Sequence, residues 1–152
     1  MMNLQNVLSE DLCCVLKEDL KNEALFIMLQ MISNKLSLPK DVADQMTRNI
    51  FYREQLMSTG IGLGIAIPHI RFEGVSEPIV AVGINEEGIP DYISIDDDVI
   101  QIVAMIIVGK DQHKEHIRLL SQVVSLLKQK EIKEKLLFAK DPHEIYTIMT
   151  GK

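Results

Sequence analysis

The residue that most clearly indicates chemistry is His69, which follows a proline at the end of a glycine-rich stretch. Residues 58–71 read S-T-G-I-G-L-G-I-A-I-P-H-I-R. An imidazole titrates near neutral pH and is a nucleophile when it is neutral. Pro68 has no N–H and restricts the residue before it to extended conformations. We therefore expect a short buried strand at 65–67 that stops at Pro68, with His69 projecting from its end, where α/β sheets place their sites.

His116 is a second candidate, because it lies in the first turn of a helix predicted over 114–128. The start of a helix presents unpaired N–H groups and the positive end of the helix dipole, and both favour an anion. Taken alone, a histidine at this position is a solvated surface residue. His113 and His116 could begin a metal site with Asp111 or Glu115, but the sequence indicates no third ligand, so we expect no metal.

Arg53 is a third candidate, because it shortly precedes the glycine-rich stretch. A guanidinium group can hold the oxygens of an anion with two parallel hydrogen bonds. The alternative is an exposed helical arginine paired with Glu54 or with an acid one turn away. Arg71 alternates with His69 along the chain, so it faces either the same site or solvent.

These residues occur in a pattern that resembles a known family. The stretch S-T-G-I-G-x-G-I-A-I-P-H resembles the signature of phosphotransferase-system (PTS) enzyme IIA domains of type 2, the mannitol, fructose and nitrogen-regulatory type. The resemblance implies that His69 accepts a phosphoryl group from the phosphocarrier HPr, or from its nitrogen-branch relative. His69 would then pass the group to a IIB component for sugar uptake. The chain would therefore be a histidine phosphotransferase component that needs no cofactor.

The same resemblance assigns roles to the other two candidates. The segment E-H-I-x-L-L at 115–120 matches the family's second histidine, which lies beside the phosphorylated one, so His116 would stabilise the phosphoryl group. The family also has an arginine near the site before the glycine run, which implies that Arg53 contacts phosphoryl oxygens. The resemblance covers nearly the whole chain, although the helical C-terminal part matches in pattern only.

Two positions differ from the family's pattern. The family usually has Asn or another polar residue at position 63 and a small residue after the histidine, whereas this chain has Leu63 and Ile70. Both changes predict a more apolar rim around His69, which would tune partner recognition or weaken phosphoryl stabilisation. The alternative function is a regulatory module of the same fold. It would dock on a transporter, kinase or transcription regulator, with phosphorylation as a switch or lost.

The apolar patterning predicts the elements that position these residues. The expected strands are 12–16, 65–67, 79–84 and 99–108, with a brief edge pairing at 92–95 and turns at 85–90 and 96–98; the expected helices are 22–35, 41–57, 114–128, 130–139 and a last helix capped by Asp141 that ends at Gly151. This order predicts an α/β protein, a three-layer α/β/α sandwich with a mixed sheet flanked by helices. We expect one domain over 1–152.

Composition limits the classes of function and partner. The chain has 152 residues with a net charge of −6, which argues against nucleic acid and is compatible with a basic protein partner. Cys13 and Cys14 are adjacent and cannot form an ordinary disulfide, which fits a reducing compartment. The N-terminus lacks the features of a secretory signal. The longest apolar run, at 99–108, is shorter than the about 20 residues that span a bilayer. We therefore expect a cytoplasmic protein without direct membrane insertion.

Nucleotide and calcium sites are not predicted. Gly60, Gly62 and Gly64 lack the spacing of G-x-G-x-x-G and precede a strand instead of following one, and no G-K-S/T occurs. The acidic run at 96–98 is not followed by a loop of EF-hand spacing, so a charged turn is expected there.

Overall fold

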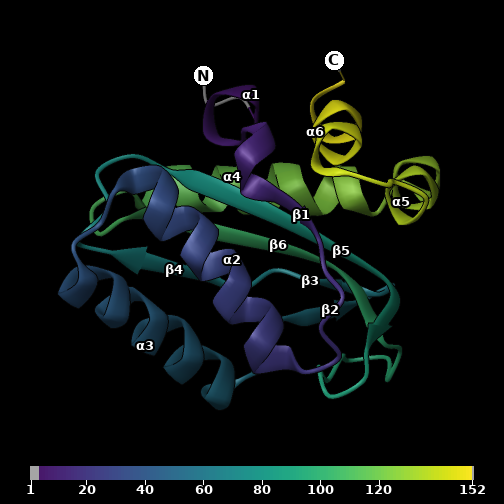
Figure 1. Ribbon diagram of the computed structural model, residues 1–152, viewed down its shortest axis with the longest axis horizontal. Helices are drawn as coiled ribbons and strands as arrows, with labels where there is room; N and C mark the ends of the chain where they lie inside the picture. Colours follow the sequence, from purple (N-terminus) through teal and green to yellow (C-terminus); the bar gives the residue numbers. More distant parts are fainter. Residues whose placement is uncertain (1–3, 152) are drawn as a thin grey trace.

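The centre of the molecule is a six-stranded mixed β-sheet between two layers of helices, as the computed structural model shows (Figure 1). The structure describes residues 4–151. Helices α2 (Lys21–Leu36) and α3 (Lys40–Leu56) pack together on one face of the sheet, and α4 (His113–Leu127) packs on β6 across the other face. The predicted three-layer α/β/α sandwich is therefore confirmed.

The shorter helices lie near the first strand. They are α1 (Leu4–Val7), the 3-10 turn η1 (Glu10–Leu12), α5 (Lys130–Leu137) and α6 (Pro142–Thr150). Helix α6 has the predicted cap, because the side chain of Asp141 accepts a hydrogen bond from the Glu144 N–H at 2.9 Å. Gly151 ends the helix with a φ of 75°, in the left-handed region that glycine adopts readily. The Glu144 carboxylate accepts the N–H of Lys140.

The strands run in the order β1, β5, β6, β3, β2, with β4 also paired to β6. Strands β5 and β6 form a central antiparallel pair, β1 is parallel to β5, and both β3 and β4 are parallel to β6. Their bounds are β1 (Cys13–Val15), β2 (Gly60–Gly62), β3 (Ile65–Ala66), β4 (His69–Phe72), β5 (Ile79–Ile89) and β6 (Ile100–Gly109). Strand β6 is buried almost throughout because helices cover both of its faces, which explains why its sequence is apolar except at the half-buried Gln101.

Strand β5 is longer than the sequence predicts. We expected a turn at 85–90, but the strand continues to Ile89 through an irregularity after Ile84. The side-chain oxygen of Asn85 accepts the N–H groups of Glu87 and Gly88, each at 3.1 Å. These two bonds close a local bulge, so the polar residues interrupt the ladder without ending the strand.

The strand that carries His69 also continues where we expected it to end. Strands β3 and β4 lie in line along β6, because Ile65 pairs with Ile102 and His69 pairs with Ile106. Pro68 has no N–H, but its carbonyl accepts the Ile106 N–H at 2.9 Å. His69 is therefore the first residue of a resumed strand and not the tip of a finished one.

Strand β2 pairs with β3 and does not extend along β4, so one edge of β4 has no partner strand among the described residues. Strand β2 pairs with β3, from Gly60 opposite Ala66 to Gly62 opposite Ile65. Within residues 4–151, β4 pairs with β6 and with no second strand. His69 therefore stands at an edge of the sheet, between helix α3 on one face and helix α4 on the other.

Candidate functional site

A cavity of about 690 Å³ lies where β4 meets helices α3 and α4. It contains all three of the residues that the sequence singles out, because its lining comprises Asn49, Arg53, His69, Ile70, Arg71, Lys110, Asp111 and His116. Residues from four parts of the chain are thus brought to one place by the parallel pairing of β4 with β6 and by the helices that flank this pair.

The ring of His69 is fixed by the backbone just before it. Its Nδ1 atom lies 2.6 Å from the carbonyl oxygen of Ile67. A carbonyl oxygen only accepts hydrogen bonds, so Nδ1 carries the proton and donates it. In the neutral ring, Nε2 then keeps its lone pair and is the nucleophilic nitrogen. The side chain is half-buried and lines the cavity, so a reacting group can approach it.

The ring of His116 stands edge-on to that of His69. Their centroids are 5.0 Å apart and their planes meet at 65°. The Nε2 atom of His116 is buried and has no hydrogen-bond partner among the described residues. Burial, followed by the charges of His69, Arg71 and His113, lowers the pKa of His116 to about 4. At neutral pH this ring is therefore uncharged and can offer one N–H to an oxygen placed between the two histidines.

Helix α4 begins one residue earlier than predicted, at His113. The backbone N–H of His116 is consequently already bonded to the carbonyl of Gln112, at 3.0 Å. The free N–H groups of a helix start belong to its first turn. His116 thus contributes its ring to the cavity, whereas the prediction that it offers the start of a helix to an anion was wrong.

Arg53 lines the cavity from the last turn of α3. Its Nη1 atom donates to the carbonyl of Met57 at 3.4 Å, which is long for a hydrogen bond. The alternative of an Arg53–Glu54 ion pair is wrong, because Glu54 is buried and pairs instead with Lys21 at 3.0 Å. The Arg53 guanidinium is therefore not neutralised by its neighbour in the chain.

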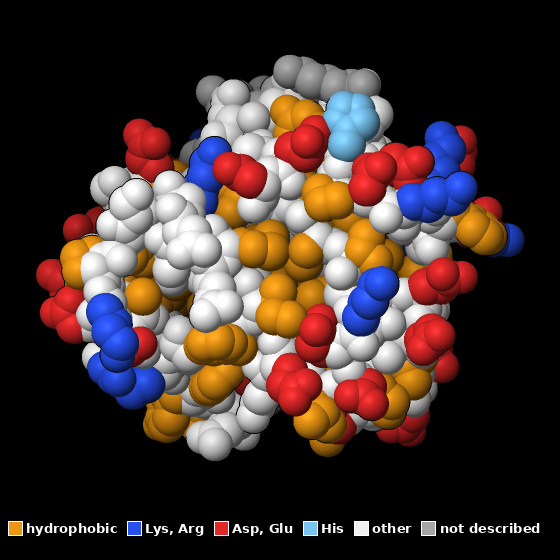
Figure 2. Space-filling view, in the orientation of Figure 1, with side chains coloured by type: hydrophobic (Ala, Val, Ile, Leu, Met, Phe, Trp, Pro, Cys, Tyr) orange, Lys and Arg blue, Asp and Glu red, His pale blue; other side chains and the backbone are white. Residues whose placement is uncertain are grey.

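The lining of the cavity is mainly cationic although the chain is acidic. Arg53, Arg71 and Lys110 carry positive charge there, and Asp111 is the one acidic residue of the lining. The net charge of the chain is −6, and acidic side chains predominate along the right and lower margins of the face in Figure 2. Local charge thus favours an anion at His69. Sequence reasoning missed Asn49 and Lys110, for which nothing local signals a site; the β4–β6 pairing and the approach of α3 bring them there.

The two residues that depart from the family's pattern have different places. Ile70 is buried and lines the cavity, as predicted. Leu63 is not part of the lining; it lies in the turn between β2 and β3, where its N–H donates to Asp96 at 2.9 Å. Four residues of extended chain, about 13 Å, separate Ile65 at that turn from His69. The prediction that Leu63 makes the rim around His69 more apolar was therefore wrong.

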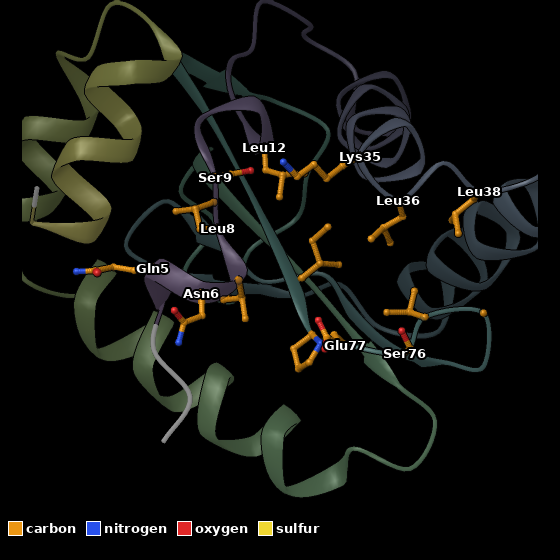
Figure 3. A pocket seen from close by; sticks show the side chains of 15 residues that line it. Gln5, Asn6, Leu8, Ser9, Leu12, Lys35, Leu36, Leu38, Ser76 and Glu77 are labelled. Carbon is orange, nitrogen blue, oxygen red and sulfur yellow. The ribbon is translucent and has the colours of Figure 1, made fainter.

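A second cavity, of about 460 Å³, lies beneath the N-terminal segment (Figure 3). Its lining comes from α1 and η1, the end of α2 and the loop before β5, and it shares no residue with the first cavity. Lys35 is paired with Asp11 at 3.1 Å. This lining contains no histidine or cysteine, so it offers no nucleophile of the kind found at His69.

Two further properties concern the described part of the chain. Within residues 4–151, no group of three histidine, cysteine or acidic side chains is arranged to hold a metal ion. None of the helices over the same residues has both the length and the apolar character needed to cross a bilayer.

Comparison with known proteins places this geometry in context. Residues 10–152 match the family model described as phosphoenolpyruvate-dependent sugar phosphotransferase system, EIIA 2. The chain is 35% identical over 130 residues to the nitrogen regulatory protein of Escherichia coli K12. The aligned region covers 86% of this chain and 78% of that protein.

Solved structures agree with the sequence match. The nitrogen regulatory protein IIA-Ntr of Neisseria meningitidis superposes with a TM-score of 0.84 at 25% identity, over 95% of this chain and 97% of that one. Enzyme IIA-Mtl from Escherichia coli, in its complex with phosphorylated enzyme IIB-Mtl, superposes with a TM-score of 0.76 at 18% identity. The superposition covers 95% of this chain and 98% of that one. At this lower identity the likeness shows the fold alone.

Proposed function

The chain belongs to the EIIA 2 family of the phosphoenolpyruvate-dependent sugar phosphotransferase system, and from this premise we propose that it carries phosphoryl groups on Nε2 of His69. The group arrives from phosphorylated HPr or its nitrogen-branch relative and leaves to a IIB component. One observation carries the proposal: the Nδ1–H of His69 is bonded to the Ile67 carbonyl, so Nε2 is the free nitrogen of a ring that lines a cation-lined cavity.

The transfer itself is a displacement at phosphorus. The Nε2 lone pair of His69 attacks the phosphorus atom, the P–N bond of the donor phosphohistidine breaks, and its electron pair stays with the donor imidazole. No proton has to leave His69, because Nδ1 keeps its proton and Nε2 has none. Bond formation makes the His69 ring more positive, and the carbonyl of Ile67 stabilises this charge through the Nδ1–H. Passing the group to IIB reverses these events.

The residues around His69 supply the electrostatic part of the reaction. Phosphoryl transfer depends mainly on positioning and on stabilising charge on the phosphoryl oxygens. Arg53 is close enough to the cavity to contact these oxygens, and the uncharged ring of His116 can donate one N–H to them. Arg71 and Lys110 add positive charge to the same lining.

Phosphotransfer from labelled phosphoenolpyruvate, with enzyme I and an HPr-type carrier, tests this function. We expect the wild-type chain to gain label and His69→Ala to gain none. His143→Ala is the matched control, because His143 is an exposed histidine paired with Glu10 outside the cavity, and it should be labelled like the wild type. We expect His116→Ala to accept label but to pass it to IIB about tenfold to hundredfold more slowly. Label on His69→Ala, or none on the wild type, would refute the carrier function.

A regulatory function is the second candidate, favoured by the 35% identity to a protein named nitrogen regulatory protein. A phosphoryl group adds about −1.5 to −2 charges. This charge would nearly cancel the net positive charge that Arg53, Arg71, Lys110 and Asp111 give the cavity lining, and so change what docks there. The discriminating result is transfer to IIB. A chain that takes label from the carrier but discharges it to no IIB component would act as a phosphorylation-dependent regulator.

A further inference from the structure

A buried ion pair holds the residue next to Arg53, in the last turn of α3. The Glu54 carboxylate is 3.0 Å from the Lys21 ammonium, and their side chains are only 4% and 16% exposed. The second oxygen of Glu54 accepts the hydroxyl of Thr59 at 2.6 Å. Glu54 follows Arg53 in the chain, so this pair fixes the same helical turn that presents Arg53 to the cavity.

Tyr92, in the loop between β5 and β6, completes this network. Its hydroxyl lies 2.9 Å from the Thr59 oxygen, and because Thr59 gives its own proton to Glu54, Tyr92 must be the donor. The Lys21 ammonium also lies 4.4 Å from the centre of the Tyr92 ring, a cation–π contact. Four side chains from α2, α3 and two loops are thus joined in one hydrogen-bonded cluster, which we call the Glu54 network: Lys21, Glu54, Thr59 and Tyr92.

The Glu54 network reaches His69 through two hydrogen bonds to the backbone of Ile67. The carbonyl of Thr59 accepts the N–H of Ile67 at 3.1 Å. The carbonyl of the same Ile67 accepts the Nδ1–H of His69 at 2.6 Å. Pro68 keeps Ile67 extended, so the Ile67 residue has little freedom to turn away once Thr59 holds its N–H. A displacement of Thr59 would therefore move the carbonyl that sets the proton position of the His69 ring.

Stability alone is a weak reason for such a cluster. A buried ion pair loses the hydration of both charges, and well-packed apolar side chains in its place are often as stabilising. A fully bonded polar network does, however, hold its members in one geometry. Here the network holds Glu54, which is next to Arg53 in the chain, and Thr59, which is linked to His69 by two hydrogen bonds through Ile67.

We propose that the Glu54 network is a positioning device, with Thr59 as its central residue, which keeps His69 in the tautomer with the proton on Nδ1 and holds Arg53 at the cavity. These residues do not contact the phosphoryl group; they act through Ile67 and through the last turn of α3. The kinetic part of the proposal depends on the phosphoryl-carrier function, whereas the tautomer of His69 does not.

The substitution Thr59→Val tests the proposal, with Thr59→Ser as the matched control. Valine keeps the shape of threonine and removes the hydroxyl, while serine keeps the hydroxyl. Long-range nitrogen–proton NMR of the unphosphorylated protein reports which nitrogen of His69 is protonated. We expect protonation on Nδ1 in the wild type and in Thr59→Ser, and a measurable Nε2–H population in Thr59→Val. For transfer from the phosphorylated carrier, we expect kcat of Thr59→Val to fall about tenfold with KM within about twofold of the wild type.

Tyr92→Phe keeps the test decisive if Thr59→Val does not fold. It removes one hydroxyl from the network and keeps the buried ring, and it should shift the tautomer and kcat in the same direction by a smaller amount. A folded Thr59→Val or Tyr92→Phe protein with unchanged His69 tautomer and unchanged kcat would overturn the proposal. If the wild type accepts no phosphoryl group, the carrier function fails, and the NMR result still decides whether the network positions His69.

Discussion

At the scale of single residues, the burial of His116 and its contact with the His69 ring affect how the site responds to pH. Rings with centroids 5.0 Å apart would repel each other if both were protonated. Burial keeps His116 uncharged, with its pKa lowered to about 4, so the repulsion does not arise near neutral pH. The His69 ring can therefore become positively charged, when Nε2 bonds to phosphorus, without repulsion from a charged His116.

The lowered pKa of His116 predicts a pH dependence of folding stability. The unfolded chain binds a proton at this residue near pH 6.5, whereas the native state does so only near pH 4. Between these values the unfolded state holds more protons, so the free energy of unfolding falls as the pH falls. We expect His116→Gln to lose part of this dependence, as measured by urea unfolding at pH 7 and pH 5. His143, whose pKa is raised by Glu10, opposes the trend equally in both proteins. Parallel pH profiles for the two proteins would contradict the prediction.

Arg53 predicts a difference between two cations of equal charge. Lysine keeps the positive charge but lacks the planar fork that binds two oxygens at once. We expect Arg53→Lys to pass label to IIB about tenfold more slowly than the wild type. Arg48→Lys is the control on the same helix, because Arg48 is exposed, bonds to Gln45 and does not line the cavity. Equal transfer rates for Arg53→Lys and the wild type would remove Arg53 from the site.

At this scale the sequence singled out the residue that we propose to react, but not its surroundings. His69 could be predicted from the local pattern of glycines, strand and proline. His116 and Arg53 were assigned from the resemblance to the family, since neither position is distinctive alone. Glu54 was considered only as a partner of Arg53, and its true partner is Lys21, on the neighbouring helix. The contacts that define the site connect distant segments, and one sequence does not record such contacts.

At the scale of elements, helices were easier to predict than strands. Helices α2 to α6 begin and end close to the predicted residues, because a helix forms its hydrogen bonds within one segment. Strand β5 extends past the predicted turn, and the strand of His69 resumes after Pro68. Both differences arise from pairing with β6, whose hydrogen bonds are made between segments that are distant in the chain.

The turn between β2 and β3 predicts a stabilising substitution. Leu63 has a φ of 60°, in the left-handed region, which costs a residue with a side chain about 1 kcal/mol or more. Its side chain is 48% exposed, so little packing is lost when it is replaced. We expect Leu63→Asn to raise the free energy of unfolding by about 0.5–1 kcal/mol in chemical denaturation, because Asn tolerates this conformation.

The control for this turn is Leu63→Ala, which keeps the unfavourable φ and should give no such gain. Phosphoryl transfer should be unchanged in Leu63→Asn, because residue 63 is outside the lining of the cavity. A transfer rate that changes severalfold would place Leu63 in contact with the site or with a partner.

At the scale of the whole molecule, the cavity and the part of the core around β5 lie at different places on the sheet. The cavity lies at the β4 edge, whereas the opposite edge of the sheet is β1, which pairs with β5, and β5 packs against helix α2. At Gly83 on β5, an added Cβ would lie 2.6 Å from Leu16 Cδ1 and 3.0 Å from Met28 Sδ. An alanine there would therefore force the Leu16 side chain to shift inside the core.

Gly83→Ala should destabilise the fold without altering the site. We expect the free energy of unfolding to fall by about 1–3 kcal/mol, as in other overpacked cores. Thermal unfolding measures this change, and labelling of His69 at a temperature where the variant is folded should match the wild type. In a Leu16→Ala background the same substitution should cost less, since its main obstacle has been removed. An equal cost in both backgrounds would show that Leu16 is not the obstacle.

The alignment of β3 and β4 along β6 limits how this part of the gene can change in length. From Ile65 to His69 and from Ile102 to Ile106 the two chains advance residue for residue, with the proline inside the interval. Side chains alternate between the two faces of a sheet, so one codon inserted or deleted between Ala66 and His69 would turn the imidazole toward the opposite helical layer. Residues in this interval can be replaced. An insertion or deletion would have to involve an even number of residues to keep the histidine on the same face of the sheet.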